Sequence, residues 1–203
     1  MPNNPAIQLA VPAANAVQLF SEAGALLNGH FLLSSGLHSP QYFQCATLLE
    51  NPLHAEALAK AMAPLCKALN AETVVSPALG AILFGYELSR ALGVRNIFAE
   101  RPEGKFELRR GFNLRPGERV ILAENVVTTG GSVLEVADMV RSLGAVVAGY
   151  AVIVDRSAGK FSPAEPVVAY AAFQAETYSP EACPLCKSGS QVTKPGSRKF
   201  QAA

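Results

Sequence analysis

One stretch decides the fold that the sequence predicts: Val120-Ile121-Leu122-Ala123-Glu124-Asn125-Val126-Val127-Thr128-Thr129-Gly130-Gly131-Ser132. It opens with four apolar residues that do not alternate with polar ones, which indicates a strand buried on both faces, as in a parallel sheet. It closes on hydroxyls and glycines. Apolar residues then recur at helical spacing, namely Val133, Val136, Ala137, Val140 and Leu143. The stretch therefore predicts a strand, a small-residue turn and a helix.

The turn in this stretch predicts a phosphate site. Small residues allow backbone N–H groups to converge, and the N-terminus of a helix adds partial positive charge. Glu124 stands near the end of the strand, where a carboxylate can accept hydrogen bonds from sugar hydroxyls. The segment therefore suits a ribose 5-phosphate group. The alternative is an ordinary strand–turn–helix corner, because a sequence cannot show that the donors converge.

The composition predicts a single domain over residues 1–203. Half of the 203 residues are hydrophobic, which is ample for a core. The net charge of +1 favours neither nucleic acid nor an anionic membrane as a partner. The longest apolar run, near residues 145–154, is too short to span a bilayer, and no secretory signal precedes residue 12. We expect a cytoplasmic protein with reduced thiols.

The order of segments predicts an α/β fold, with a parallel sheet flanked by helices on both faces. Strands are expected near residues 73–75, 95–99, 120–127, 146–154 and 167–171, with helices between the earlier ones. Asn51-Pro52 is a favourable helix start, and Pro64 is expected to kink that helix or end it early. Asn15 and Gln18 resemble a capping box at the start of a first helix.

The motif from Glu124 to Ser132 resembles the phosphoribosyl-diphosphate motif of the type I phosphoribosyltransferases, which follows an apolar strand with two acidic residues, two apolar residues and Thr-Thr-Gly-Gly-Ser. The resemblance implies that Glu124 and Asn125 hold the ribose hydroxyls. It also implies that the 5′-phosphate is bound by Val127, Thr128, Thr129, Gly130, Gly131 and Ser132. Asn125 stands where the family has its second carboxylate. An amide still exchanges hydrogen bonds with a hydroxyl, but it supplies no negative charge near a developing sugar cation.

A second small-residue turn, at residues 76–81, also follows a buried strand and opens a helix. In open parallel sheets, ligands bind at the carboxyl ends of the strands, so both turns can face one ligand. The resemblance implies that this turn binds pyrophosphate, through Ala78, Leu79 and Gly80. The alternative is a plain turn.

The polar connection at residues 100–115 carries five of the 17 basic residues. It is either a solvated hairpin or a mobile cover whose cations close on a departing pyrophosphate. The resemblance implies a catalytic loop here, with Arg101 and Lys105 as the best candidates and Arg109 and Arg110 as weaker ones. In the family this loop reaches the neighbouring subunit, which implies a homodimer.

Two further features resemble the orotate phosphoribosyltransferases. In these enzymes the strand after the main helix ends in Asp-Arg, as at Asp155-Arg156, and the arginine holds the orotate carboxylate. A simple salt bridge within the pair is the alternative. The segment at residues 31–43 resembles their hood over the base, to which Ser34, Tyr42 and Phe43 would contribute. We expect the hood to comprise about residues 1–45 and the C-terminal segment.

The resemblance implies transfer of the phosphoribosyl group of 5-phosphoribosyl 1-diphosphate to orotate, giving orotidine 5′-monophosphate and pyrophosphate in UMP synthesis. Mg²⁺ would arrive on the diphosphate, without a dedicated protein metal site. Two alternatives stay open: a purine or xanthine phosphoribosyltransferase, and a regulator that binds the diphosphate without turnover.

The sequence Cys183-Pro-Leu-Cys186 is a CxxC motif without a second pair. Zinc needs about four ligands, and the spacing of the other cysteines and histidines completes no zinc pattern. We expect unliganded thiols in a C-terminal loop, with a site shared between two chains as the alternative.

Overall fold

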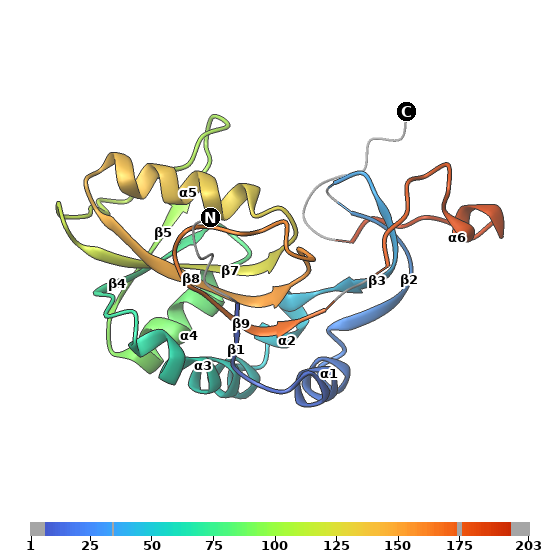
Figure 1. Ribbon diagram of the computed structural model, residues 1–203, viewed down its shortest axis with the longest axis horizontal. Coiled ribbons are helices and arrows are strands. Elements are labelled where there is room, and N and C mark those ends of the chain that lie inside the picture. The colour runs from blue at the N-terminus through green and yellow to red at the C-terminus, as the bar shows by residue number, and fades with distance from the viewer. Residues whose placement is uncertain (1–6, 34, 174–175, 196–203) are drawn as a thin grey trace.

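The central sheet has seven strands in the order β1-β9-β8-β7-β4-β5-β6 (Figure 1). The structure is a computed structural model, and it describes residues 7–33, 35–173 and 176–195. Neighbouring strands run parallel except β5 and β6. The strands are β1 (Gln8–Leu9), β4 (Thr73–Pro77), β5 (Arg95–Glu100), β6 (Glu107–Leu108), β7 (Arg119–Val127), β8 (Val146–Asp155) and β9 (Val167–Ala172). The predicted α/β fold is confirmed.

Helices cover both faces of the sheet, as the sequence predicts (Figure 1). Helix α5 (Gly131–Ser142) lies on one face, and α3 (Pro52–Lys67) and α4 (Ile82–Leu92) lie on the other. Successive strand residues point to opposite faces, so Ile121 packs in the core with α3 and α4 while Leu122 packs in the core with α5. Both faces are buried, which explains why β7 and β8 are apolar without alternation.

Two helix predictions are wrong in part. The Asn51 cap is confirmed, because its side chain accepts a hydrogen bond from the Leu53 N–H at 3.0 Å. However, α3 continues through Pro64 to Lys67. Pro64 is exposed, so water can reach the Lys60 carbonyl that loses its helical partner, while buried residues on both sides of Pro64 hold the helix against the core. Helix α1 (Ala13–Glu22) begins before Asn15 and has no side-chain cap, so the predicted capping box does not form.

A separate two-stranded sheet carries the candidate hood. Strands β2 (Leu26–Leu32) and β3 (His38–Phe43) pair antiparallel, and we call them the hood hairpin. Two further helices are short: α2 (Cys45–Leu49) comes directly after β3, and α6 (Pro184–Lys187) lies in the C-terminal segment. The C-terminal segment lies against the hairpin, through a bridge of Phe31 with Thr193 and another of His38 with Tyr178 (Figure 1). Segments far apart in the sequence therefore build this part of the molecule together.

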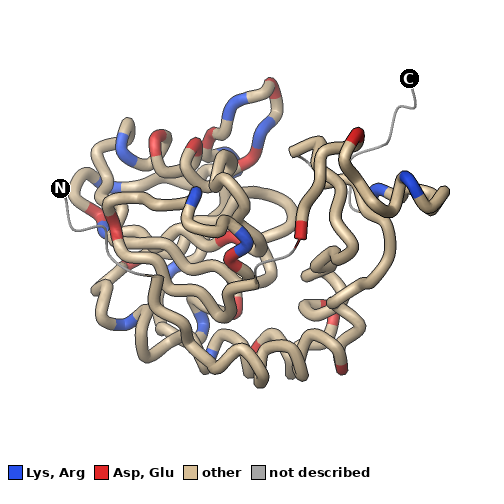
Figure 2. The backbone as a smooth tube through the Cα atoms, turned by 45° about the vertical axis from the view of Figure 1, so that its right-hand side comes forward, with Lys and Arg blue, Asp and Glu red and all other residues tan. Residues whose placement is uncertain are grey.

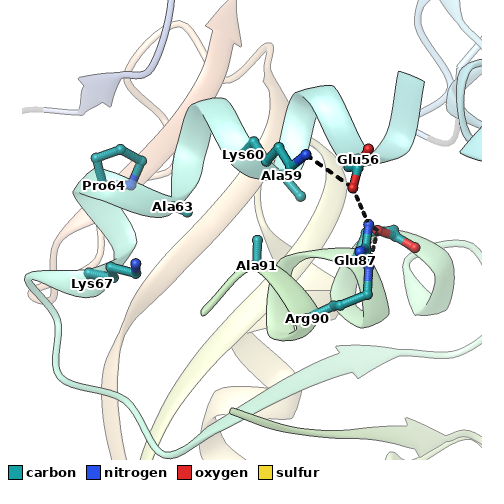
Figure 3. A pocket seen from close by; sticks show the side chains of 9 residues that line it. All are labelled: Glu56, Ala59, Lys60, Ala63, Pro64, Lys67, Glu87, Arg90 and Ala91. Carbon is teal, nitrogen blue, oxygen red and sulfur yellow. Dashed lines mark hydrogen bonds and ion pairs between the residues drawn. The ribbon is translucent and has the colours of Figure 1, made fainter. Parts of the chain in front are cut away.

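A hollow of about 450 Å³ lies between α3 and α4 (Figure 3). Arg90 bridges Glu56 of α3, at 2.9 Å, and Glu87 of its own helix, at 2.8 Å. Arg90 is exposed and the two glutamates are partly exposed, and surface pairs of this kind contribute little stability. The hollow shares no lining residue with the strand tips described below. Among the described residues, no helix is both long and apolar enough to cross a membrane.

Candidate functional site

The turn between β7 and α5 presents unused backbone donors. The first N–H groups of a helix have no acceptor within it, and no hydrogen bond among the described residues uses the N–H of Gly131, Ser132 or Val133. Gly130 has a φ of 77°, and a Cβ there would lie 2.2 Å from the Phe161 ring, so only glycine fits. The turn lines a cavity of about 300 Å³. An anion bound there would meet these N–H groups and the positive end of α5.

Three cavities meet at Glu124. The cavity at the turn between β7 and α5 adjoins one of about 170 Å³ on the side of residues 77–81 and one of about 690 Å³ beneath the hood hairpin. Glu124 lines all three, and Gly80 lines two of them. The carboxyl ends of β4 and β7 thus share one crevice, as open parallel sheets generally provide. The predicted residues of the two turns lie around this crevice.

Burial dominates the chemistry of the Glu124 side chain. The side chain is half-buried, and its desolvation raises the pKa of the carboxyl group to about 7. The backbone N–H of Asn125 donates to Glu124 Oε1 at 2.8 Å and partly offsets this effect. A cation or a diol placed against the carboxylate would favour its ionised form.

Asn125 has a structural task that a carboxylate could not perform. Its Nδ2 donates to the Gly80 carbonyl at 2.8 Å and so ties β7 to the second turn, in which the Ala78–Leu79 peptide bond is cis. A carboxylate at this position would set oxygen against oxygen. Asn125 Oδ1 is buried and has no hydrogen-bond partner in the part of the chain that the structure describes. This oxygen remains available to a ligand.

The predicted loop cations differ in where they lie. Arg101 lines the 170 Å³ cavity, pairs with Glu135 of α5 and stacks on Phe106, with Cζ 4.2 Å from the ring centroid. Glu135 also accepts the Phe106 N–H at 3.0 Å. Sequence reasoning missed Glu135, which falls inside an ordinary helical pattern. The loop therefore rests on α5 in this conformation.

The other loop cations do not line the three cavities. Arg109 and Arg110 both pair with Glu100. Lys105 is exposed, and no ion pair to it occurs among the described residues. Figure 2 shows basic and acidic residues interspersed along the projecting loop. Of the four predicted loop cations, only Arg101 therefore lies at the crevice.

Arg156, which directly follows β8, is a partly buried cation without an acidic partner in the described chain. Its Nη2 donates to Ser39 Oγ at 3.3 Å, its Nε has no partner among the described residues, and desolvation lowers its pKa. Asp155 instead accepts the Ser157 N–H at 2.8 Å, so the simple ion pair with Arg156 is not observed. A partly buried guanidinium without an acidic partner among the described residues favours an anionic ligand.

The hood residues surround the largest of the three cavities. Tyr42 and Phe43 both line it, although Phe43 is 4% exposed and also packs on Phe173, with ring centroids 4.8 Å apart. The Arg156 Cζ lies 5.5 Å from the Phe43 ring centroid, but Arg156 itself does not line the cavity. Ser34 lies outside the described residues.

Lys194 is a cavity residue that sequence reasoning missed. It follows Thr193, whose N–H donates to the His30 carbonyl at 2.8 Å and whose carbonyl accepts the Leu32 N–H at 2.8 Å. These two bonds lay the segment along β2 and place Lys194 at the 690 Å³ cavity with Tyr42. The polar composition of the C-terminal segment gave no signal of this placement.

Comparisons with known proteins agree with this geometry. Residues 44–179 match the family described as the phosphoribosyl transferase domain. The chain is 48% identical over 184 residues to an orotate phosphoribosyltransferase of Desulforamulus reducens, covering 91% of this chain and 96% of that protein. It is 51% identical over 199 residues to that of Wolinella succinogenes, covering 91% and 97%. The Mycobacterium tuberculosis orotate phosphoribosyltransferase, solved with inorganic phosphate, shares the fold with a TM-score of 0.62 at 21% identity, covering 78% of this chain and 96% of that one.

Proposed function

The chain belongs to the phosphoribosyl transferase domain family, among its orotate phosphoribosyltransferases, and from this premise we propose that it joins orotate to the phosphoribosyl group of 5-phosphoribosyl 1-diphosphate. The products are orotidine 5′-monophosphate and pyrophosphate, so the enzyme acts in UMP synthesis. The cytoplasm, where such biosynthesis uses soluble substrates, is the compartment that we infer.

We assign a role in the reaction to each part of the crevice. The turn at residues 128–132 binds the 5′-phosphate through backbone N–H groups, while Glu124 and Asn125 hold the ribose hydroxyls. The turn at residues 78–80 faces the pyrophosphate. When the bond from C1 to pyrophosphate breaks, the ribose becomes cationic and the leaving group gains negative charge. Arg101 then releases Glu135 and closes on the leaving group, and the other loop cations follow it.

Magnesium fits this crevice as a companion of the diphosphate. Mg²⁺ prefers oxygen ligands and commonly combines one or two carboxylates with substrate phosphates. Glu124 offers a carboxylate, and Asn125 Oδ1 offers a buried oxygen that has no partner among the described residues. When bound, the ion neutralises charge on the diphosphate. Positioning and electrostatic stabilisation then supply the acceleration.

Arg156 is the residue that supports orotate as the base. A guanidinium fork binds a carboxylate through two parallel hydrogen bonds, and Arg156 has no acidic partner in the described chain. Purine bases carry no carboxylate, so this cation supports orotate over hypoxanthine or xanthine. Because Arg156 does not line the cavity in this conformation, we expect the hood hairpin to shift when the base enters.

We also propose a homodimer. Leu79, Leu83 and Tyr86 are exposed by 81%, 54% and 56%. Leu83 and Tyr86 lie three residues apart on one face of α4, and Leu79 lies in the turn that precedes this helix. Such a row of large apolar side chains supports contact with another protein surface. Leu79 and Leu83 also line the 690 Å³ cavity, so a second copy on this face would lie beside the site. Sedimentation showing a fully active monomer would refute this proposal.

The decisive test is a turnover assay with orotate, hypoxanthine and xanthine, each with 5-phosphoribosyl 1-diphosphate and Mg²⁺. We expect product from orotate. Product from a purine base alone would support the purine enzyme, and tight diphosphate binding without any product would support the regulator.

Arg156→Ala should lower kcat/KM for orotate by about 100-fold, because a charge-assisted pair contributes roughly 2–3 kcal/mol. Arg90→Ala, between α3 and α4, is the matched control and should leave kcat/KM unchanged. Equal effects of the two variants would contradict the role of Arg156.

A further inference from the structure

Four side chains that the proposed reaction does not use converge where the C-terminal segment meets the hood hairpin. His30 and His38 come from β2 and β3, and Cys183 and Cys186 flank and enter α6. One ligand atom from each lies within 4.8 Å of all the others. His30, His38 and Cys183 are 4%, 6% and 0% exposed. The CxxC motif therefore has partners, and the expectation of unliganded thiols in a loop overlooked them.

The distances between these atoms resemble those of a tetrahedral metal centre. Three sulfur–nitrogen distances are 3.5, 3.7 and 3.3 Å, from Cys183 and Cys186 to His30 Nε2 and from Cys186 to His38 Nδ1. Zinc bonds of normal length imply about 3.6 Å between sulfur and nitrogen in a tetrahedron. His30 Nε2 and His38 Nδ1 are 2.8 Å apart and would separate to about 3.3 Å around an ion. The required shifts are within the reach of side-chain rotation.

The surroundings of His30 also favour a metal. Its Nδ1 lies 2.8 Å from the Ser190 carbonyl. A carbonyl accepts only, so Nδ1 carries the proton and Nε2 presents a lone pair to the cluster. Histidines that bind metals commonly donate their other ring N–H in this way. Two thiolates and two imidazoles form a set that selects zinc, and four protein ligands leave no open position for catalysis.

We propose that His30 Nε2, His38 Nδ1, Cys183 Sγ and Cys186 Sγ bind one zinc ion that fastens the C-terminal segment to the hood hairpin. Ser190 and Thr193 then continue along β2 and bring Lys194 to the largest cavity. Ser39, next to His38, contacts Arg156. The zinc ion therefore makes the hairpin and the segment move as one body. This last consequence rests on the proposed function, whereas zinc binding does not.

The test of binding measures metal on the full chain. After purification without chelators, we expect about one zinc per chain by elemental mass spectrometry, and less than about a tenth in Cys186→Ser or His38→Ala. The matched controls are Cys66→Ala and His54→Ala, which remove the same groups elsewhere and should keep the ion. His38→Cys should keep it too, because a third thiolate also completes a zinc site. If His38→Cys retains zinc, the residue at position 38 acts as a metal ligand and not only as a member of a hydrogen-bonded cluster.

Measurements on the unmodified chain remain decisive if a variant fails to fold. Cobalt added after chelation should give the charge-transfer absorption of a thiolate-bound tetrahedral ion, and zinc should restore the Tm that the chelator lowers. The proposal would be overturned by a chain that contains no metal and whose Tm changes neither with zinc nor with the chelator. An iron cluster, or a mass showing a Cys183–Cys186 disulfide, would also overturn it.

The consequence for the active site is measured separately. Zinc removal should raise KM for orotate several-fold and change KM for the diphosphate less, because we place the diphosphate on the turns after β4 and β7, whereas Ser39 of the hood hairpin contacts Arg156. Zinc bound without any orotate turnover would refute the proposed function and leave the metal site standing. Orotate turnover by a chain that fails to bind zinc in the metal-binding tests would refute the metal site and leave the proposed function standing.

Discussion

The substitution Glu124→Gln tests whether burial controls the carboxyl group at which the three cavities meet. Burial raises the pKa of Glu124 to about 7 from an ordinary value of 4.5. A raised pKa means that the folded chain holds this proton more tightly than the unfolded chain does. The stability from this group is therefore complete below the unfolded pKa and is lost as pH rises through the folded one. Glutamine keeps the shape and does not titrate.

The expected magnitude follows from the size of the shift. A difference of about 2.5 pKa units corresponds to about 3 kcal/mol in the free energy of unfolding. About 2.5 kcal/mol of this falls between pH 5 and pH 8, because part of the loss occurs below pH 5. The variant should therefore gain that much stability relative to the wild type across this range.

Urea unfolding at four pH values, followed by circular dichroism, gives the free energy of unfolding for each protein. The contributions of the other titrating groups to the free energy of unfolding cancel when one curve is subtracted from the other. Glu50→Gln is the matched control, because it makes the same substitution at an exposed side chain. A difference between Glu124→Gln and wild type that stays constant within about 0.5 kcal/mol would refute the argument from burial.

Three further predictions concern the turns and the exposed face. Asn125→Asp should lower the free energy of unfolding by about 1–3 kcal/mol in the same urea assay, because it replaces the donor to Gly80 with an oxygen; an unchanged midpoint would contradict this. Gly130→Ala should lower the Tm, reflecting a loss of about 2 kcal/mol or more, since its Cβ would meet Phe161. Gly131→Ala is its control, because the nearest neighbour there is 3.8 Å away, and equal Tm values would count against the steric argument. Leu83→Glu should shift the sedimentation coefficient to that of a monomer, and an unshifted dimer would place the interface elsewhere.

The fold could be predicted because its signals are local. The apolar run of β7, the glycines before α5 and the Asn51 cap each act within a few residues, and each was found where expected. Pro64 does not end α3 early, because tertiary packing outweighs one lost hydrogen bond at an exposed position. The two small-residue turns could be located for the same local reason, although the sequence could not show that Glu124 lines the cavities beside both of them.

The missed residues depend on contacts between distant segments. Glu135 looks like any polar residue of an amphipathic helix until Arg101 is seen beside it. Lys194 and the CxxC motif reach the region of the hood hairpin from distant positions: His30 and Cys183, for example, are 153 positions apart in the sequence. No linear spacing encodes such a meeting, so only the folded chain reveals it.

The pairing of β1 with β9 has a consequence for how the protein is made. Gln8 and Leu9 pair with Val168 and Ala169, and the hood hairpin likewise needs residues 178 and 193. During synthesis, β1 therefore lacks its partner strand until residues 168–169 have left the ribosome, and the hood hairpin lacks its two bridges until residues 178 and 193 have followed. Such late closure slows folding and prolongs the time in which a nascent chain is open to chaperones or to aggregation.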